Sequence, residues 1–386
     1  MTVPKLRFKD DNGNDYPAWE EKKIKDIAPL QRGFDLPTQK LHNGNYPVVY
    51  SNGIGAFHSQ YKCVGEAVIT GRFGTIGNVI YLPNCKYWPH NTTLWVTDFC
   101  NNYPKFVYYL FTQIDLSRFS SGSGVPTLNR NDIHSFKVCI PSLPEQKKIA
   151  DFFSSFDKRI ETTQKKLATL EKLKKGFMQK IFSQQLRFKD DDGNEYPAWE
   201  EKRLGEVTVK YKGNTLSKDN LDSEGMYPCL LYGELYTTYG PIASTILSRT
   251  NKLGKGMWVS EKDDVVVPVS GETAIDISTA TCIKQNGVVI GGDLLILHSS
   301  RILGDFLSYS LNYPLKLTIA KYAQGASIVH MNIDSLMKVH IKFPSLPEQQ
   351  KIADFLSAFD KKIDLVRKEV DTLQTIKKGL LQQMFV

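Results

Sequence analysis

Polar, glycine-containing segments in two regions of the chain, 23–140 and 203–343, hold the residue types that could do chemistry. These segments are 51–57 (SNGIGAF), 71–78 (GRFGTIGN) and 88–93 (WPHNTT) in the first region, and 231–240 (LYGELYTTYG) and 270–278 (SGETAIDIS) in the second. Arg, Asn, Ser, Thr, His and Glu side chains hydrogen-bond to the edges of nucleic-acid bases, and glycine allows a loop to approach a groove or a phosphate. These segments are therefore candidates for nucleic-acid binding, although glycine-rich turns between strands are common in proteins of every kind.

Sequence motifs of the common enzyme classes are absent. There is no GxxxxGK[ST] phosphate loop, no GxGxxG, no HExxH and no GxSxG, and the Asn/Asp-Pro-Pro-aromatic motif of amino-methyltransferases does not occur. The six cysteines form no CxxC pair, and no histidine lies at metal-ligand spacing from them. We therefore expect no catalytic residue, no metal site and no cofactor on this chain.

Length and charge favour a soluble protein of two or more domains with a polyanionic partner. The chain has 386 residues and a net charge of +8. Segments 146–183 and 350–386 carry +6 and +2 of that charge, which favours a polyanionic partner. No apolar run reaches the roughly 18 residues of a membrane span, and residues 1–10 lack the apolar core of a signal peptide. We expect a cytoplasmic protein.

Two blocks of sequence occur twice. Residues 6–22 (LRFKDDNGNDYPAWEEK) and 186–202 (LRFKDDDGNEYPAWEEK) agree at 15 of 17 positions, and residues 141–160 and 344–363, which both begin PSLPEQ, agree at 16 of 20. The stretches between the blocks barely resemble each other, and the second is 23 residues longer. A matching scaffold with different contents indicates two domain-sized halves that do one task on two targets.

Each PSLPEQ block predicts the start of a long helix. The pairs Ser142–Glu145 and Ser345–Glu348 have the spacing of a capping box. Apolar residues then recur every three or four positions over 149–170 and 352–373, which is the pattern of a coiled-coil seam. We expect the two helices, each of about 35 residues or roughly 50 Å, to pair antiparallel, since a globular region separates them; separate packing of each helix on its own domain is the alternative. Their lysine-rich faces are either solvated flanks or contacts to DNA phosphates.

The regions between the blocks are predicted to mix strands and helices. Strand-like runs are 47–51, 67–71, 76–82 and 92–97 in the first region and 228–232, 265–270 and 293–298 in the second. One helix is expected over 103–119, and 302–322 is expected to be largely helical. The predicted fold class is mixed α/β: two globular α+β domains joined by two long helices that pair as an antiparallel coiled coil with pseudo-twofold symmetry.

The doubled order of variable region and helix resembles the specificity subunits of Type I restriction–modification systems. The residues that carry the resemblance are PSLPEQ at 141–146 and 344–349, KIADF at 148–152 and 351–355, and the LRF…YPAWE blocks at 6–20 and 186–200. The resemblance spans nearly the whole chain. It implies target-recognition domains at 1–143 and 184–346 and repeated helices at 144–183 and 347–386.

The resemblance also implies a function and a set of partners. Each recognition domain would read one half of a split, asymmetric sequence in double-stranded DNA, and the paired helices would set the gap, near one helical turn of about 34 Å. Two modification subunits with adenine methyltransferase activity and two restriction subunits, the motor–nucleases, would dock on this non-catalytic chain. S-adenosylmethionine, ATP and Mg²⁺ would bind those partner subunits. No membrane is involved.

Analogy with such recognition domains nominates nine residues for DNA contact. They are Arg72, Thr75, His90, Asn91, Tyr232, Glu234, Ser270, Glu272 and Thr273. Three other classes of protein stay open at this point: a free-standing binder of a split DNA site without enzyme partners, a structural adaptor built on a coiled coil, and an enzyme with an unrecognised site.

Overall fold

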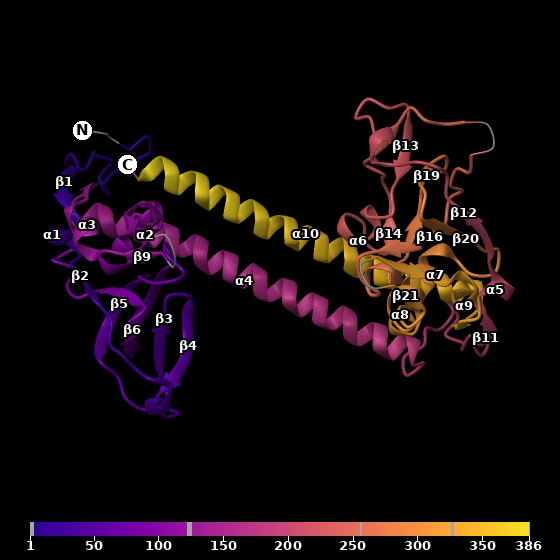
Figure 1. Cartoon of the computed structure of the whole chain (residues 1–386), viewed down its shortest axis with the longest axis horizontal. Helices are drawn as coiled ribbons and strands as arrows, with labels where there is room; N and C mark the ends of the chain where they lie inside the picture. The colour runs from indigo at the N-terminus through magenta and orange to yellow at the C-terminus, as the bar shows by residue number, and fades with distance from the viewer. Residues whose placement is uncertain (1–3, 122–125, 255–256, 326–327, 386) are drawn as a thin grey trace. The chain divides into compact units, whose positions relative to one another are not determined.

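A computed structural model of the protein describes residues 4–121, 126–254, 257–325 and 328–385. The chain divides into two compact units: unit 1 is residues 1–165 with 367–386, and unit 2 is residues 166–366. Both boundaries fall inside long helices, α4 (Leu143–Phe182) and α10 (Leu346–Met384). Each unit therefore contains one domain and half of each long helix (Figure 1).

Unit 1 is built on a six-stranded sheet in the order β2–β7–β5–β6–β3–β4. Its strands are β2 (Leu30–Arg32), β3 (Tyr46–Tyr50), β4 (Gly53–His58), β5 (Cys63–Gly71), β6 (Val79–Pro89) and β7 (Thr93–Val96). The neighbours are antiparallel except β3 and β6, which run parallel. Helix α2 (Pro104–Gln113) packs against β5 and β6.

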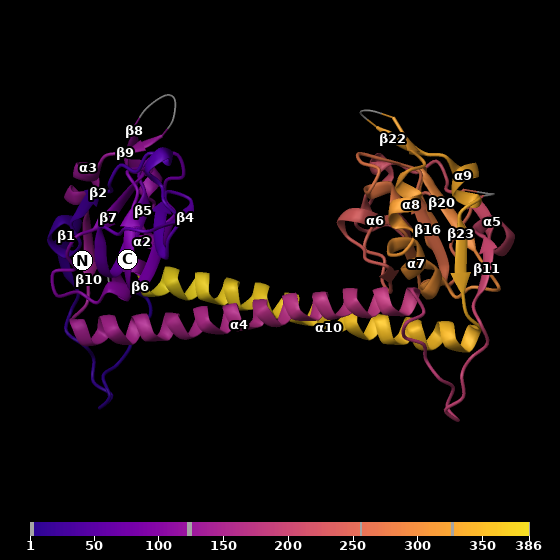
Figure 2. The ribbon, with the colours of Figure 1, turned by 90° about the horizontal axis from the view of Figure 1, so that it is seen from below.

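The remaining elements of unit 1 are short. They are β1 (Glu20–Lys23), α1 (Ile24–Ile27), η1 (Thr38–Lys40), η2 (Leu116–Phe119), β8 (Ser120–Ser121), β9 (Thr127–Leu128), α3 (Arg130–Ser135) and β10 (Lys137–Ile140). Strand β10 pairs antiparallel with β1 and leads directly into α4. In Figure 2, β10 lies beside the start of α4, whereas β8 and β9 lie at the end of the unit away from that helix.

Unit 2 has a five-stranded sheet, β12–β20–β16–β18–β14, and two three-stranded sheets, β15–β13–β19 and β17–β22–β21. These strands are β12 (Val209–Lys212), β13 (Tyr227–Leu230), β14 (Ile242–Ala243), β15 (Arg249–Thr250), β16 (Asp264–Pro268), β17 (Ser270–Gly271), β18 (Thr281–Ile283), β19 (Val289–Ile290), β20 (Leu294–His298), β21 (Ala323–Gln324) and β22 (Val329–Met331).

The other elements of unit 2 match the order of unit 1 only in part. They are β11 (Glu200–Arg203), α5 (Leu204–Val207), η3 (Lys218–Asn220), α6 (Glu234–Thr237), η4 (Asp276–Ser278), α7 (Gly304–Asn312), α8 (Lys316–Ala320), α9 (Ile333–Met337) and β23 (His340–Phe343). Helix α7 packs against β16 and β18, as α2 packs on its sheet in unit 1. Strand β23 pairs antiparallel with β11 and leads into α10.

The long helices pair antiparallel, as predicted. In unit 1 the first half of α4 packs with the end of α10, and in unit 2 the first half of α10 packs with the end of α4. The seam residues Leu170, Ile363 and Val366 are buried together. Both helices also enter the domain cores: Ile149 and Phe153 join the core of unit 1, and equivalent residues of α10 join that of unit 2.

The seam changes where its spacing slips. Leu173 and Ile376, three residues beyond the last regular position of each helix, are 47% and 45% exposed. Burial resumes at Met178 and Ile181 of α4, which lie in the core of unit 2. Beyond the irregular spacing α4 packs on both α10 and the domain, since the ring of Phe177 also lies 5.1 and 5.6 Å from the rings of Phe355 and Phe359.

Two local predictions are wrong. Residues 103–119 do not form one helix, because α2 ends at Gln113 and a separate 3₁₀ turn, η2, begins at Leu116. The capping boxes at the starts of the long helices do not form either: the hydroxyls of Ser142 and Ser345 have no hydrogen-bond partner among the described residues. The glutamates expected to complete those boxes bind arginines instead.

Within the described ranges, no helix has the length and apolar character needed to span a membrane.

Candidate nucleic-acid interface

The two repeated blocks meet within each unit. In unit 1 Arg7 donates from Nε and Nη2 to the two carboxylate oxygens of Glu145, at 3.0 and 2.7 Å, and from Nη2 to the carbonyl of Pro17 at 2.8 Å. In unit 2 Arg187 binds Glu348 in the same way, at 3.1 and 2.6 Å. Both glutamates are buried. The hydrogen bond to Glu145 raises the pKa of Arg7, and the two-point pair is the strong geometry for this ion pair.

The glutamine that follows each glutamate connects the long helix to the domain. Gln146 accepts from the backbone N–H of Tyr103, just before α2, at 2.9 Å and donates to Asn102 and to the carbonyl of Pro141. In unit 2 Gln349 accepts from the backbone N–H of Leu303, just before α7, at 2.8 Å. The PEQ motif therefore joins each domain to its long helix.

A tyrosine, an aspartate and a lysine make a second matched connection. In unit 2 the hydroxyl of Tyr309 in α7 donates to Asp360 of α10 at 2.6 Å, and Lys174 of α4 forms an ion pair with that carboxylate. Burial and the neighbouring carboxylate raise the pKa of Tyr309, so its hydroxyl remains a donor.

Unit 1 holds the equivalent cluster of Tyr109, Asp157 and Lys377. We call each of these a Tyr–Asp–Lys cluster. Each one joins the domain helix to both long helices within its own unit.

The polar surface of unit 1 includes β9, at the end of the unit away from α4 (Figure 2). In unit 1 a hollow of about 400 Å³ is lined by Arg32, Arg72 and Arg130 together with Thr127, Asn129 and Asn131. Arg72 is half-buried, and among the described residues its guanidinium has no hydrogen bond or ion pair. Its backbone is held on both sides, by the carbonyl of Thr92 and by the N–H of Leu128. An arginine whose guanidinium has no partner among the described residues, and whose backbone is held in place, suits the recognition of guanine or phosphate.

His90 and Asn91 are not among the residues that line this hollow. Asn91 donates to Asp35, which also accepts from Arg32 at 3.1 Å. The imidazole of His90 lies 3.1 Å from the hydroxyl of Thr92, and burial lowers its pKa. Thr92 connects His90 to Arg72, because its carbonyl accepts from the backbone N–H of Arg72, and Asp35 connects Asn91 to Arg32.

Thr75 is exposed on the turn beyond Arg72 and does not line the hollow. The turn needs glycine at position 71, because a side chain there would meet the carbonyl oxygen of Thr75 at 1.8 Å. Sequence reasoning missed Arg32 and Arg130. Neither lies in a glycine-rich segment, and only the pairing of β2 with β7 and the placement of α3 bring them to Arg72.

In unit 2, Tyr232 and Glu234 lie at the turn that begins α6. Tyr232 is 38% exposed. Both carboxylate oxygens of Glu234 are engaged, one by the backbone N–H of Leu231 at 2.7 Å and the other by the hydroxyl of Ser248 at 2.6 Å. Glu234 therefore shapes the turn, whereas Tyr232 is available to a ligand.

The other predicted residues of unit 2 lie around β17. Ser270 is buried, and its hydroxyl lies 2.9 Å from Nδ1 of His330, an exposed residue of β22. Glu272 and Thr273 are exposed, and Thr273 donates to Asp276 at 2.7 Å. The candidate surface of unit 2 is thus rich in carboxylates and hydroxyls, whereas that of unit 1 is rich in arginine.

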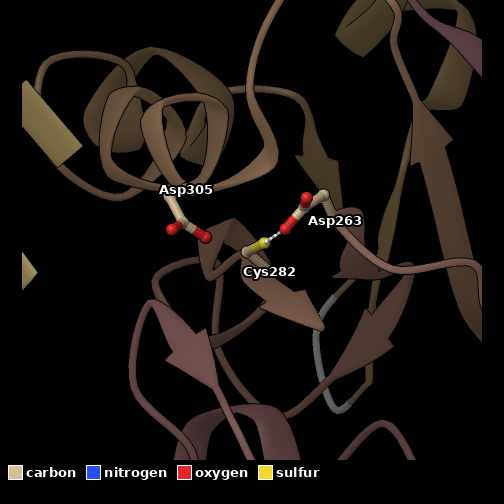
Figure 3. Close-up of side chains that lie close together, drawn as sticks. All are labelled: Asp263, Cys282 and Asp305. Atoms are coloured by element: carbon tan, nitrogen blue, oxygen red, sulfur yellow. Dashed lines mark hydrogen bonds between the residues drawn. The ribbon is translucent and has the colours of Figure 1, made fainter. Parts of the chain in front are cut away.

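One group of possible metal ligands exists among the described residues: Asp263, Cys282 and Asp305 in unit 2 (Figure 3). Lys284 already forms ion pairs with both carboxylates. Burial lowers the pKa of Lys284, but the hydrogen bonds to the two aspartates outweigh this effect and the net shift is upward. Burial also raises the pKa of Cys282, so its thiol stays protonated. A lysine ammonium therefore takes the place that a metal would need.

The fold has two sheet domains, each joined to the pair of antiparallel helices and each with its own polar surface. This arrangement defines a binding protein with two binding domains. The family model of the Type I restriction modification DNA specificity domain matches residues 17–172 and 197–375. Because these spans cover most of the chain, the protein belongs to this family. It is a DNA specificity subunit of a Type I restriction–modification system, a subunit type that is not itself catalytic.

Relatives of known type agree with this assignment. The putative type I restriction enzyme MjaX specificity subunit of Methanocaldococcus jannaschii is 29% identical over 294 residues, which cover 72% of this chain and 66% of that protein. The MjaIX specificity subunit of the same organism is 23% identical over 95% of this chain and 92% of its own length.

The fold matches the crystal structure of a Type I S subunit from M. genitalium with a TM-score of 0.69. That match has 18% identity and covers 100% of this chain and 99% of that one. A chain from a structural study of type I R-M complex assembly and conformational transition matches with a TM-score of 0.53 at 18% identity, over 96% of this chain and 97% of that one.

Proposed function

We propose that this specificity subunit reads a split, asymmetric sequence in double-stranded DNA, one half with each unit. Unit 1 would use the surface around Arg72, His90 and Asn91, joined by Arg32 and Arg130. In unit 2 the nominated residues Tyr232, Glu272 and Thr273 are exposed and would contact bases, whereas Glu234 and Ser270 would hold the surface in shape.

The observation that carries this proposal is the combination of matched scaffolds and unmatched surfaces. The Arg–Glu pair and the Tyr–Asp–Lys cluster occur in both units, formed by residues of the same type at equivalent positions. The polar ends differ in charge, with three arginines in unit 1 and Glu272 and Asp276 in unit 2. Direct readout depends on the pattern of donors and acceptors, so unequal surfaces favour unequal half-sites.

The proposed organisation has recognition domains at 1–143 and 184–346 and repeated helices at 144–183 and 347–386, which set the gap between half-sites. Two modification subunits and two restriction subunits would assemble on it. S-adenosylmethionine would bind the modification subunits, and ATP with Mg²⁺ the restriction subunits.

Single-molecule methylation sequencing of the host genome, before and after deletion of this gene, tests the proposal. Loss of adenine methylation at one split, asymmetric motif is the expected result and reads out both half-sites. An unchanged methylation pattern, with the modification subunit demonstrably expressed, would contradict it and favour a free-standing DNA binder.

A further inference from the structure

The strands β3 to β7 of unit 1 lie in a segment that almost lacks carboxylates. Residues 36–97 contain four Lys or Arg and a single acidic residue, Glu66. Glu66 is already engaged, since it accepts from the hydroxyl of Tyr81. The corresponding segment of unit 2, residues 216–298, contains ten acidic and six basic residues. The excess of positive charge in this part of the fold therefore belongs to unit 1 alone.

Two lysines of this segment, Lys62 and Lys86, are held over aromatic rings. Each Nζ atom lies 4.7 to 5.9 Å from the centres of two rings, which are those of Phe34 and Trp88 for Lys62 and of Tyr46 and Tyr61 for Lys86. The attraction between a cation and the face of a ring restricts where the ammonium group can move. We call the two lysines and these four rings the lysine track.

The ammonium groups of the lysine track are available to a ligand. Both lysines are exposed. Within the described ranges, neither ammonium group forms an ion pair or a hydrogen bond. A cation that is positioned by rings, with no carboxylate beside it, keeps its attraction for an anion from another molecule.

The lysine track begins beside the arginine-lined hollow. Phe34 follows Arg32, a lining residue of the hollow, by two positions, and its carbonyl accepts from Nε1 of Trp88 at 3.2 Å. Lys86 and Trp88 are two positions apart in β6, so their side chains lie on one face of the sheet. The positive groups therefore continue from Arg32 to Lys62 and then to Lys86. In the view of Figure 1, β3 to β6 lie at the side of unit 1 away from both chain termini.

The chemistry of the lysine track fits the phosphates of DNA. Lysine ammonium groups supply the sequence-independent part of DNA affinity, and contacts to phosphates fix the position of a protein on the duplex. We propose that the lysine track binds the sugar–phosphate backbone next to the half-site that unit 1 reads, so that unit 1 is the stronger electrostatic anchor of the two units. This inference rests on the proposed function, in which unit 1 binds DNA, and adds a contact that carries no sequence information.

The test is the salt dependence of DNA binding by the complex of the full chain with its modification subunits. Duplexes with and without the methylated motif are titrated between about 50 and 200 mM salt. The variants are Lys62→Gln, Lys86→Gln and the double variant, which remove charge from exposed side chains. The control is Lys262→Gln, which removes the charge of an exposed lysine that lies between Glu261 and Asp263 in the sequence of unit 2.

Each single variant should lower the slope of log K against log salt by roughly one, and the double variant by roughly two, because each phosphate contact contributes about 0.9 to that slope. The affinity should fall by the same factor for both duplexes, and the methylated motif should stay the same. Lys262→Gln should leave the slope unchanged. Methylphosphonate substitution, which neutralises one phosphate at a time, should weaken binding of the wild-type complex beside the unit 1 half-site and should not weaken the double variant further at those phosphates.

An unchanged slope for the double variant would overturn this inference alone. So would a loss of affinity confined to one base pair of the motif, which would make the lysines base readers. A loss of modification-subunit binding with an unchanged slope would assign the lysine track to a protein partner instead. A wild-type complex that binds neither duplex would overturn the inference and the proposed function together.

Discussion

The guanidinium of Arg7 lies against the buried carboxylate of Glu145, with donor–acceptor distances of 3.0 and 2.7 Å. The two residues are 138 positions apart, and their counterparts Arg187 and Glu348 are 161 apart. The pair explains why two separate blocks repeat together although the region between them changes in sequence and length. Each domain can vary as long as both of its ends meet at this ion pair.

Replacing Arg7 by methionine should destabilise unit 1 by about 3–5 kcal/mol, because the carboxylate of Glu145 would remain buried without its partner. Denaturant unfolding followed by hydrogen exchange measures this. Arg159→Met is the control, since Arg159 and Glu369 form an exposed ion pair worth under about 1 kcal/mol. Adding Glu145→Gln to Arg7→Met should restore part of the lost free energy of unfolding. If Arg7→Met and Arg159→Met had the same free energy of unfolding, Arg7 would not be needed to neutralise the buried carboxylate of Glu145.

Lys174→Met should relax the gap between half-sites without changing the half-sites themselves. Lys174 and Asp360 lie in the two long helices, and Tyr309 lies in the domain, so the cluster fixes how the domain of unit 2 sits on its helices. Methylation of a library of targets with gaps about one base pair longer or shorter measures the effect. Arg159→Met should leave the gap unchanged. A variant that keeps the single wild-type gap would show that the cluster only adds stability.

Arg72→Ala should weaken specific DNA binding by about 1–3 kcal/mol and relax the preference at one base pair of the unit 1 half-site. The reason is that the guanidinium faces the hollow without an internal partner among the described residues. Binding to targets substituted at each position should be compared with that of Lys218→Ala, which removes an exposed charge in η3 of unit 2. A uniform loss over all targets with a smaller salt dependence would instead assign Arg72 to a phosphate.

Unit 1 should lose stability as the pH falls below about 6.5, the ordinary pKa of histidine, because of His134. Burial lowers the pKa of His134, and its Nε2 accepts from the backbone N–H of Leu30 at 2.8 Å, which requires the neutral ring. The stabilisation is complete above the unfolded pKa and is lost as the pH falls through the lower folded value. Thermal unfolding of His134→Gln should fall less steeply between pH 7 and 5; parallel curves would exclude His134 as the cause.

Chelators should leave the thermal stability of the protein unchanged, because Lys284 rather than a metal neutralises Asp263 and Asp305. Lys284→Met should lower the stability of unit 2 by about 1–3 kcal/mol, the cost of leaving partly buried charged groups unpaired. Differential scanning calorimetry with and without EDTA tests both statements. A chelator-sensitive transition in the wild-type protein would show that a metal binds.

The repeated elements could be predicted from sequence because their signals are local. The seam spacing after each PSLPEQ block predicts the helices that form α4 and α10, and the runs 47–51, 92–97 and 293–298 correspond to β3, β7 and β20. The duplication itself predicts two units of similar construction. Hydrophobic periodicity and internal repeats are properties of neighbouring residues, so they are legible without the fold.

The connections between distant residues were decided by the tertiary structure. The S-x-x-E spacing predicts capping boxes, yet Glu145 and Glu348 bind arginines more than a hundred positions away. One feature of the sequence points to the Tyr–Asp–Lys clusters: Phe106–Tyr109 and Phe306–Tyr309 share a Phe-x-x-Tyr spacing. That spacing does not predict which aspartate and which lysine contact each tyrosine.

The DNA surface divides in the same way. Arg72 could be nominated from its glycine-rich loop, whereas Arg32 and Arg130 join it only through the pairing of β2 and the placement of α3. Local patterns determine which segments become helices and strands. Only packing brings residues that are distant in sequence within hydrogen-bonding reach, and in this protein those contacts fix each domain on its helices and form the arginine-lined surface.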